Sequence, residues 1–327
     1  MITRIPNEPP KIAPIADYVG KRPKWSVMIP TYNCLPYLKK TLESVLSQNV
    51  GEDEMQIEVI DDCSKDGDYE ALIAEVGNGR IGFYRQEDNM GSLRNFETCI
   101  NRARGYFVHI LHGDDMIKPG YYKEIDSLFK KFPDAGAAFT DYIYMDENSK
   151  ELFANKKLSV ERGVVDNWLT IIAQTNRIQP PAIVVKRSVY ENLGSFFGVH
   201  YGEDWEMWAR IAAKYPFAYT PEILASYRRL PNSISGLGKR SGDNIHKIRW
   251  VIDRIQDYLP MDERERSRKA AFRWYSRYMM SSAFSVWAKT KDRSTALALM
   301  KGAHSLRSDL YIHGRSMLLL LRLLLGF

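Results

Sequence analysis

The feature that most constrains the fold is an alternation of short apolar segments with amphipathic segments in the first half of the chain. YFVHIL (106–111) is so continuously apolar that we expect a central strand covered on both faces. WSVMI (25–29), QIEVID (56–61) and IGFYRQ (81–86) are also predicted strands, and residues 36–48 repeat apolar side chains at helical spacing. This alternation predicts an α/β fold with a mostly parallel sheet flanked by helices on both faces.

Further elements follow along the chain. Ser92 is the expected N-cap of one helix, and Pro119 is expected to open another. The later predicted elements are the strands GAAFTDYIYMD (136–146), AIVVK (182–186) and ILASYRR (223–229), and the helix EDWEMWARIAAKY (203–215). A boundary is expected at PNSISGLGKRSG (231–242), beyond which the pattern is helical throughout.

Charge divides the chain at this boundary. The net charge is +6, yet residues 1–238 hold 28 Lys and Arg against 32 Asp and Glu, whereas residues 239–327 hold 18 against 8. An acid-rich part is typical of a catalytic body, and a basic tail is typical of a surface that meets anions. We expect no nucleic-acid partner, since such an enzyme more often carries positive charge through its catalytic part as well.

The N-terminal segment and the cysteines suggest where the protein works. Residues 1–23 contain five prolines and no apolar stretch, so we expect an extended arm and no signal peptide. Cys34, Cys63 and Cys99 are spaced like neither a zinc site nor a disulfide framework, which favours reduced thiols in the cytoplasm. The expected domains are therefore the arm (1–23), a catalytic domain (24–238) and a basic helical region (239–327).

One motif is set aside. Residues 77–82 match the G-x-G-x-x-G pattern of dinucleotide-binding proteins. That pattern works between a strand and a following helix, whose N-terminus receives the pyrophosphate. Here a predicted helix precedes it and a predicted strand follows, so we interpret it as a turn.

Acidic pairs occur where predicted parallel strands end. Asp61 and Asp62 end the second strand, and Asp114 and Asp115 follow the strand at 106–111. Ligands bind at this edge of open α/β sheets, and paired carboxylates beside a phosphate-bearing substrate indicate a divalent cation. Each pair taken alone could equally be a solvated turn or a helix cap. The pair at 203–204 is either favourable to a helix dipole or a general base.

Six motifs, taken together and in this order, resemble the inverting family 2 glycosyltransferases of the GT-A fold. They are VMIPTYN (27–33), VIDDCSKDG (59–67), DNMGSLRN (88–95), LHGDD (111–115), GEDW (202–205) and YRRLPNSIS (227–235). The resemblance covers roughly residues 24–236. It implies a GT-A-type, Rossmann-like fold with a mostly parallel mixed sheet flanked by helices. It also implies transfer of a sugar from a nucleoside-diphosphate sugar, with UDP-sugars favoured.

The resemblance also implies nucleotide-binding residues. Pro30, Thr31 and Tyr32 would line the base pocket, Asp62 would accept a hydrogen bond from the base, and Arg94 would lie near the base or the diphosphate.

Metal and catalytic roles follow from the same resemblance. Asp114 would bind Mn²⁺ or Mg²⁺, which bridges the two phosphates, and His112 and Gly113 would adjoin the nucleotide. Asp204 would deprotonate the acceptor hydroxyl, supported by Glu203. A single carboxylate on the acceptor side implies one displacement with inversion.

Two positions depart from the family pattern. His112 stands where the family's D-x-D motif has its first carboxylate, and Leu230 stands where many relatives have a histidine. His109 is not expected to join His112, because an odd offset along a strand points two side chains to opposite faces.

The C-terminal region is basic and ends in a strongly apolar stretch. Residues 262–293 interleave arginines with aromatic side chains, and Phe272, Tyr275, Met279 and Phe284 fall roughly on one helical side. MLLLLRLLLGF (317–327) would rise only about 16 Å as a helix, too little to cross a bilayer. We expect attachment to the inner face of the cell membrane, the alternative being packing within a bundle or homo-oligomer.

The prediction is therefore a metal-dependent inverting glycosyltransferase, peripheral on the cytoplasmic face of the membrane, acting on a glycan or lipid-linked glycan. A non-catalytic nucleotide-sugar-binding scaffold is the alternative, supported by His112 and Leu230. A nucleotidyltransferase fits less well, because PTYNCLPYL (30–38) lacks the expected Gly-rich basic loop.

Overall fold

The computed structural model describes residues 3–15, 20–231, 233, 236 and 244–326. The chain forms two compact units. The first unit comprises Met1–Trp168, Ile178–His200 and Arg210–Arg229, and the second unit comprises Leu169–Arg177, Tyr201–Ala209 and Leu230–Phe327. The boundaries expected from the sequence remain a prediction.

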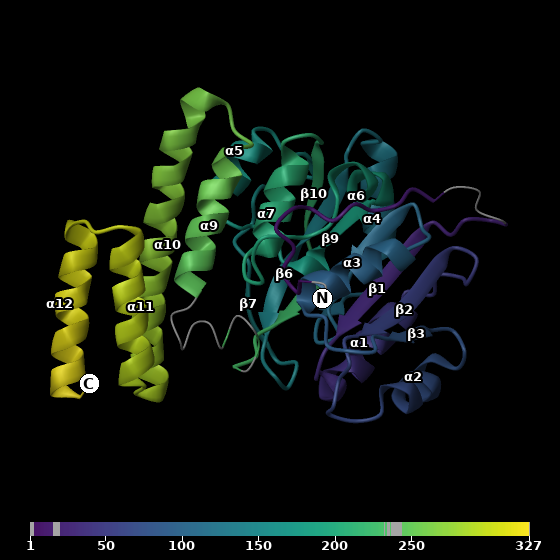
Figure 1. The fold of residues 1–327 in the computed structure, drawn as a ribbon, viewed down its shortest axis with the longest axis horizontal. Coiled ribbons are helices and arrows are strands. Elements are labelled where there is room, and N and C mark those ends of the chain that lie inside the picture. Colours follow the sequence, from purple (N-terminus) through teal and green to yellow (C-terminus); the bar gives the residue numbers. More distant parts are fainter. Residues whose placement is uncertain (1–2, 16–19, 232, 234–235, 237–243, 327) are drawn as a thin grey trace. The chain divides into compact units, whose positions relative to one another are not determined.

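The first unit is built on a mixed sheet, shown in Figure 1. Its strand order is β3-β2-β1-β4-β9-β6-β10-β5, with β7 paired to β6 and β8 to β10. The strands are β1 (Trp25–Thr31), β2 (Met55–Asp61), β3 (Gly82–Arg85), β4 (Phe107–Ile110), β5 (Met116–Ile117), β6 (Ala137–Met145), β7 (Glu151–Ala154), β8 (Gly163–Val164), β9 (Ile183–Lys186) and β10 (Phe217–Arg228). Pairs among β1, β2, β3 and β4 are parallel, as is β6 with β10, whereas β9 runs antiparallel to both its neighbours.

Helices cover both faces of this sheet. One core cluster joins Val27 and Ile29 of β1 to side chains of α1 (Leu35–Leu46), α2 (Tyr69–Gly77) and α4 (Tyr121–Lys131). Met28 lies between those two β1 residues and is fully buried, so by strand alternation it belongs to the other face. Helix α3 (Ser92–Arg102) packs on β1, β2 and β4, and α6 (Arg187–Leu193) on β9. A mostly parallel mixed sheet covered by helices is thus confirmed.

Several local predictions are corrected. Ser92 is the first residue of α3, and Gly91, with φ 85°, occupies the N-cap. Pro119 precedes α4 rather than opening it, because Gly120 at φ 89° is the N-cap. Strand β10 begins at Phe217, six residues before the expected start, and contains a bulge between Thr220 and Ala225. The turn at 77–82 is confirmed, since α2 ends at Gly77 and β3 begins at Gly82.

The remaining short elements lie between these strands. They are α5 (Trp168–Gln174), the 3₁₀ turn η1 (Pro180–Ala182) and α7 (Glu203–Ala212), which ends three residues earlier than expected. Strands β5, β7 and β8 were not expected, because two to four residues show no readable alternation. Most of the expected boundary at 231–242 lies outside the described residues.

The second unit is mainly a group of helices. They are α9 (Asn244–Gln256), α10 (Met261–Thr290), α11 (Arg293–Leu306) and α12 (Leu310–Leu325). Of the four aromatic and Met residues expected on one side of α10, Phe272, Met279 and Phe284 are buried, and Tyr275 is partly exposed. Helix α10 packs against α9, α11 and α12. No helix among the described residues is both long enough and apolar enough to cross a membrane.

The cysteines remain free thiols. Cys34 and Cys99 are buried and Cys63 is partly exposed. Burial raises the pKa of the Cys34 and Cys99 thiols, which keeps them protonated.

Candidate active site

The loop between β4 and β5 is held against the end of β1. The Leu111 amide donates to Met28 O at 3.0 Å and the Gly113 amide to Pro30 O at 3.1 Å. A Cβ on Gly113 would lie 2.6 Å from Thr31 Cγ2 and 2.8 Å from Cys34 Sγ. Only glycine fits so close an approach, and the loop therefore leaves the sheet at a fixed position.

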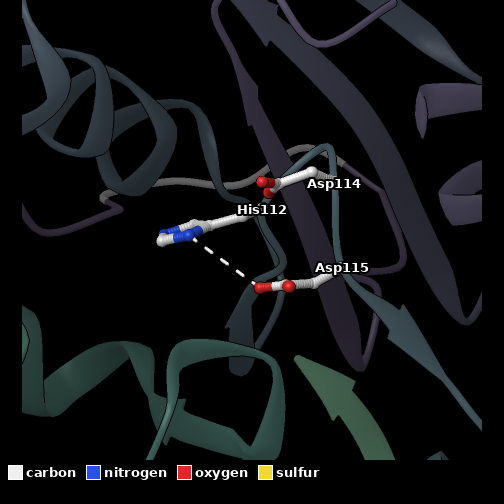
Figure 2. Close-up of side chains that lie close together, drawn as sticks. All are labelled: His112, Asp114 and Asp115. Carbon is white, nitrogen blue, oxygen red and sulfur yellow. Dashed lines mark ion pairs between the residues drawn. The ribbon is translucent and has the colours of Figure 1, made fainter. Parts of the chain in front are cut away.

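Three side chains of this loop come together. One ligand atom from each of His112, Asp114 and Asp115 lies within 4.8 Å of the others. Figure 2 shows both carboxylates pointing to the side on which the His112 ring lies, with His112 Nδ1 at 4.0 Å from Asp115 Oδ2. The His112 ring stacks on Phe96 with centroids 5.3 Å apart. His109 takes no part, since it contacts Tyr122 Oη and Pro181 O.

Asp115 was expected from the sequence as one member of an acidic pair, whereas the resemblance assigned the metal to Asp114 alone. It is 1% exposed, and its Oδ1 accepts from the Arg228 amide at 2.8 Å. Its Oδ2 is buried and has no hydrogen-bond partner among the described residues. Burial, followed by the charge of Asp114, raises the Asp115 pKa well above its ordinary value. A buried carboxylate oxygen without a partner is costly, and a cation ligated there would remove that cost.

Two further residues shape the loop and were not among the candidate residues of the sequence analysis. Arg228, at the end of β10, donates from Nε to Asp114 O at 2.7 Å and stacks on Tyr37. Thr41 of α1 donates through Oγ1 to Gly113 O at 3.0 Å and to Asp115 O at 2.7 Å. Arg228 belongs to the YRRLPNSIS motif, which was the only sequence signal that pointed to it.

The residues expected to line a base pocket lie at the ends of β1 and β2. Pro30 and Thr31 end β1, are buried, and Thr31 Oγ1 donates to Asp61 Oδ1 at 3.2 Å. Tyr32 follows β1 and is 52% exposed, so its ring is available for stacking. Asp61 is fully buried and bonded to Thr31, Ser64 and Arg85, which makes it a structural carboxylate.

Asp62 fixes a neighbouring loop. Its Oδ1 accepts from the Met90 amide at 2.7 Å, and its Oδ2 accepts from the Gly91 amide at 2.9 Å and Asn89 Nδ2 at 3.0 Å. Burial raises the Asp62 pKa, and the two amide bonds and the charge of Arg4 act against that rise. Arg94 donates to Glu97 Oε2 at 2.6 Å and to Thr3 O at 2.9 Å.

The acidic pair of the second unit starts helix α7. Asp204 Oδ2 accepts from Asn176 Nδ2 at 3.0 Å and its Oδ1 accepts from the Trp205 amide at 2.7 Å. Burial raises the pKa of Asp204, and these hydrogen bonds partly counter that rise. Burial and then the Asp204 charge raise the pKa of Glu203. Of the pair, Asp204 is therefore the one held ionised.

Comparison with known proteins identifies the family. The model of glycosyl transferase family 2 matches residues 26–190, half of the chain. The chain therefore belongs to glycosyl transferase family 2, and it is a nucleotide-sugar-dependent glycosyltransferase, inverting as its family is. It is 29% identical over 227 residues to the putative teichuronic acid biosynthesis glycosyltransferase TuaG of Bacillus subtilis, covering 65% of this chain and 82% of TuaG.

Solved structures show that the fold is of the GT-A type. S. aureus TarS (residues 1–349) in complex with UDP-GlcNAc aligns with a TM-score of 0.65 and 16% identity, over 87% of this chain and 82% of that chain. The mannosyltransferase PcManGT from Pyrobaculum calidifontis, in complex with GDP-Man and Mn²⁺, aligns with a TM-score of 0.54 and 16% identity, over 94% and 81%.

Proposed function

We propose that this protein transfers a sugar from a nucleoside-diphosphate sugar, with UDP-sugars favoured, to a hydroxyl of a glycan or lipid-linked glycan during polysaccharide biosynthesis. The observation that carries the proposal is the cluster of His112, Asp114 and Asp115 at the carboxyl edge of the sheet, where one buried carboxylate oxygen accepts no hydrogen bond from the described residues. Similarity to TuaG supports a polysaccharide product.

The donor would be held by the first unit. Tyr32 stacks on the base, with Pro30, Thr31 and Asp62 beside it. The cluster suits Mn²⁺ or Mg²⁺, because carboxylate oxygens are the ligands these ions prefer and Mn²⁺ also accepts imidazole nitrogen. Asp114 and Asp115 would ligate the ion, with His112 as a further ligand or a ribose contact. A divalent cation bound there neutralises negative charge on the leaving diphosphate.

The acceptor hydroxyl would be activated by a carboxylate at the start of helix α7. We assign Asp204 as the general base that takes the proton of the attacking hydroxyl, since it is the member of the acidic pair held ionised by hydrogen bonds. Glu203, protonated beside it, lowers the repulsion that two adjacent carboxylates would suffer. Attack from the side opposite the leaving group inverts the anomeric centre.

The acceptor's membrane would be met by α12. Among its exposed side chains, five apolar ones are defined here as the apolar strip: Leu310, Met317, Leu321, Leu324 and Leu325. The opposite side is buried and contains Ile312, Leu319 and Leu323. We propose that the strip inserts into the cytoplasmic face of the cell membrane, with the basic residues of the region near anionic lipid.

A ligand screen tests the proposal. Thermal unfolding is measured with a panel of nucleotide sugars, each with Mn²⁺, Mg²⁺ or EDTA. One donor at 100 times its Kd should add about 2.7 kcal/mol, and the effect should need the metal. Asp115→Asn keeps an oxygen for the Arg228 amide but removes the charge, so it should fold normally and lose the metal-dependent shift. The absence of any shift in the wild-type protein would count against donor binding altogether.

A further inference from the structure

The N-terminal arm (residues 3–15) is fastened to the first unit along its length. Beyond Thr3, three of its carbonyl groups accept hydrogen bonds: Pro6 O from Gly198 N at 2.8 Å, Pro10 O from Ser195 N at 2.8 Å and Ala13 O from Arg187 Nη2 at 3.2 Å. Ile12 is 3% exposed. Prolines keep the arm extended and lack the N–H groups that would otherwise need partners.

The body is shaped to receive this arm. Gly194 has φ +78°, and a Cβ there would lie 2.7 Å from Pro10 O and 2.9 Å from Pro9 Cβ. Any other residue would push the arm away, so its path is encoded on both sides of the contact.

The start of the arm reaches the loop that Asp62 fixes. Thr3 O accepts from Arg94 Nε at 2.9 Å, and Arg4 Nη2 donates to Asn89 Oδ1. A Cβ on Gly91 would lie 3.1 Å from Arg4 Nε. The guanidinium therefore packs on the loop that supplies all three hydrogen bonds to Asp62.

Donor and acceptor capacity remains on both groups. A carboxylate has about four acceptor positions, of which Asp62 uses one on Oδ1 and two on Oδ2. Arg4 is exposed, and within the described residues one hydrogen bond, to Asn89, engages its guanidinium, which has about five N–H donors. The positive charge of Arg4 also helps to hold Asp62 ionised.

An acceptor next to a donor matches one kind of nucleobase edge. Uracil and guanine present a ring N–H beside a carbonyl oxygen, whereas cytosine and adenine present a ring nitrogen acceptor beside an amino group. A carboxylate that faces the ring nitrogen, with a guanidinium that faces the neighbouring exocyclic group, complements the first pattern and opposes the second.

We propose that Arg4 is a nucleotide-binding residue of the donor site, donating to the base carbonyl next to the ring N–H that Asp62 accepts. The arm thereby selects uracil- or guanine-type donors over cytosine- and adenine-type donors. This inference rests on the proposed function, because it takes the Tyr32 and Asp62 edge as the base pocket.

Isothermal titration with UDP, GDP, CDP and ADP, each with Mn²⁺, tests the inference. The wild-type protein should bind UDP or GDP more tightly than CDP and ADP. Arg4→Ala should lower the affinity for the favoured nucleotide about tenfold and leave the affinities for the disfavoured nucleotides unchanged. The preference among bases therefore becomes smaller. The affinity of the Arg4→Lys variant should lie between those of the wild-type protein and the Arg4→Ala variant. The reason is that one ammonium group cannot donate to both Asn89 and the base in the geometry that a guanidinium allows.

Arg22→Ala is the matched control. Arg22 also joins the segment before β1 to the body, because it donates to Arg104 O at 2.6 Å and to Gly105 O at 3.0 Å. Its replacement by alanine should leave nucleotide binding unchanged. The inference would be overturned, while the proposed function stands, if the Arg4→Ala variant bound UDP and GDP as tightly as the wild-type protein does. Tighter binding of CDP than of UDP and GDP by the wild-type protein would have the same consequence. Wild-type protein that binds none of the four nucleotides would instead overturn the proposed function, and this inference with it.

Discussion

At the scale of single residues, Glu203 and Asp204 are adjacent carboxyl groups with different surroundings. The Asp204 carboxylate receives hydrogen bonds from Trp205 N and Asn176 Nδ2, whereas burial and the neighbouring charge favour protonated Glu203. Asp204→Asn should therefore lower kcat by about 10²–10⁴ and leave donor Kd unchanged. Glu203→Gln imitates the protonated acid and should retain most activity. The assignment fails if the two variants lose turnover equally in initial-rate assays.

The same surroundings set a pH dependence. A base works only when ionised, and burial raises the Asp204 pKa, so kcat should fall on the acid side at a higher pH than a free aspartate, about 3.9, would give. Asn176→Ala removes a hydrogen bond that lowers this pKa, so the acid limb of the kcat–pH profile should move to still higher pH. Asn192→Ala, which removes an exposed bond to Tyr215, should leave the limb in place. If kcat fell at the same pH in the Asn176→Ala variant and the wild-type protein, the role of Asn176 would be contradicted.

At the scale of elements, the β4–β5 loop depends on a close contact with β1. Gly113→Ala would force a Cβ to 2.6 Å from Thr31 Cγ2, and this overpacking should destabilise the fold by about 1–3 kcal/mol. The shifted loop should also weaken Mn²⁺-dependent donor binding. Gly51→Ala, where no atom lies within 4 Å of the added Cβ, should change neither property. Urea unfolding with nucleotide titration measures both, and an unchanged Gly113→Ala protein would show that the loop is not held this tightly.

Element boundaries also show how close local prediction comes. Periodicity identified α1, α3 and α4, but glycines at positive φ moved the starts of two of them, with Gly91 and Gly120 in the N-cap positions. Residue preference at a cap is a weak local signal, and a glycine that enters the helix from the left-handed region overrides it.

At the scale of the whole molecule, the apolar strip of α12 can be tested as a membrane-binding surface against the alternative of an oligomer interface. Leu321→Glu with Leu324→Glu places two charges on exposed positions and should reduce co-sedimentation with phosphatidylglycerol vesicles at least about tenfold. Ser281→Glu with Ser285→Glu adds the same charge to exposed positions of α10 and should reduce it far less. The strip would instead be an oligomer interface if the wild-type protein does not bind vesicles and is a dimer by light scattering. In that case the variant with Leu321→Glu and Leu324→Glu should be a monomer.

The sequence by itself determined the α/β class, the order of the main strands and helices, and the motifs that place the chain in its family. Each of these depends on neighbours within a few residues, through alternation, helical spacing or a short motif. For this reason the sequence alone marks Asp114, Tyr32 and Asp204 as candidate site residues.

Only the tertiary structure decided which residues that are distant in the sequence lie close together in space. Arg228 lies 113 residues from the Asp115 carboxylate that its amide binds, and Arg4 lies 85 residues from Asn89. No local pattern encodes such pairs, because they exist only after parallel strands bring their ends to one edge and the arm packs beside them. The buried Asp115 oxygen, which accepts no hydrogen bond from the described residues, and the guanidinium beside Asp62 are consequences of that packing.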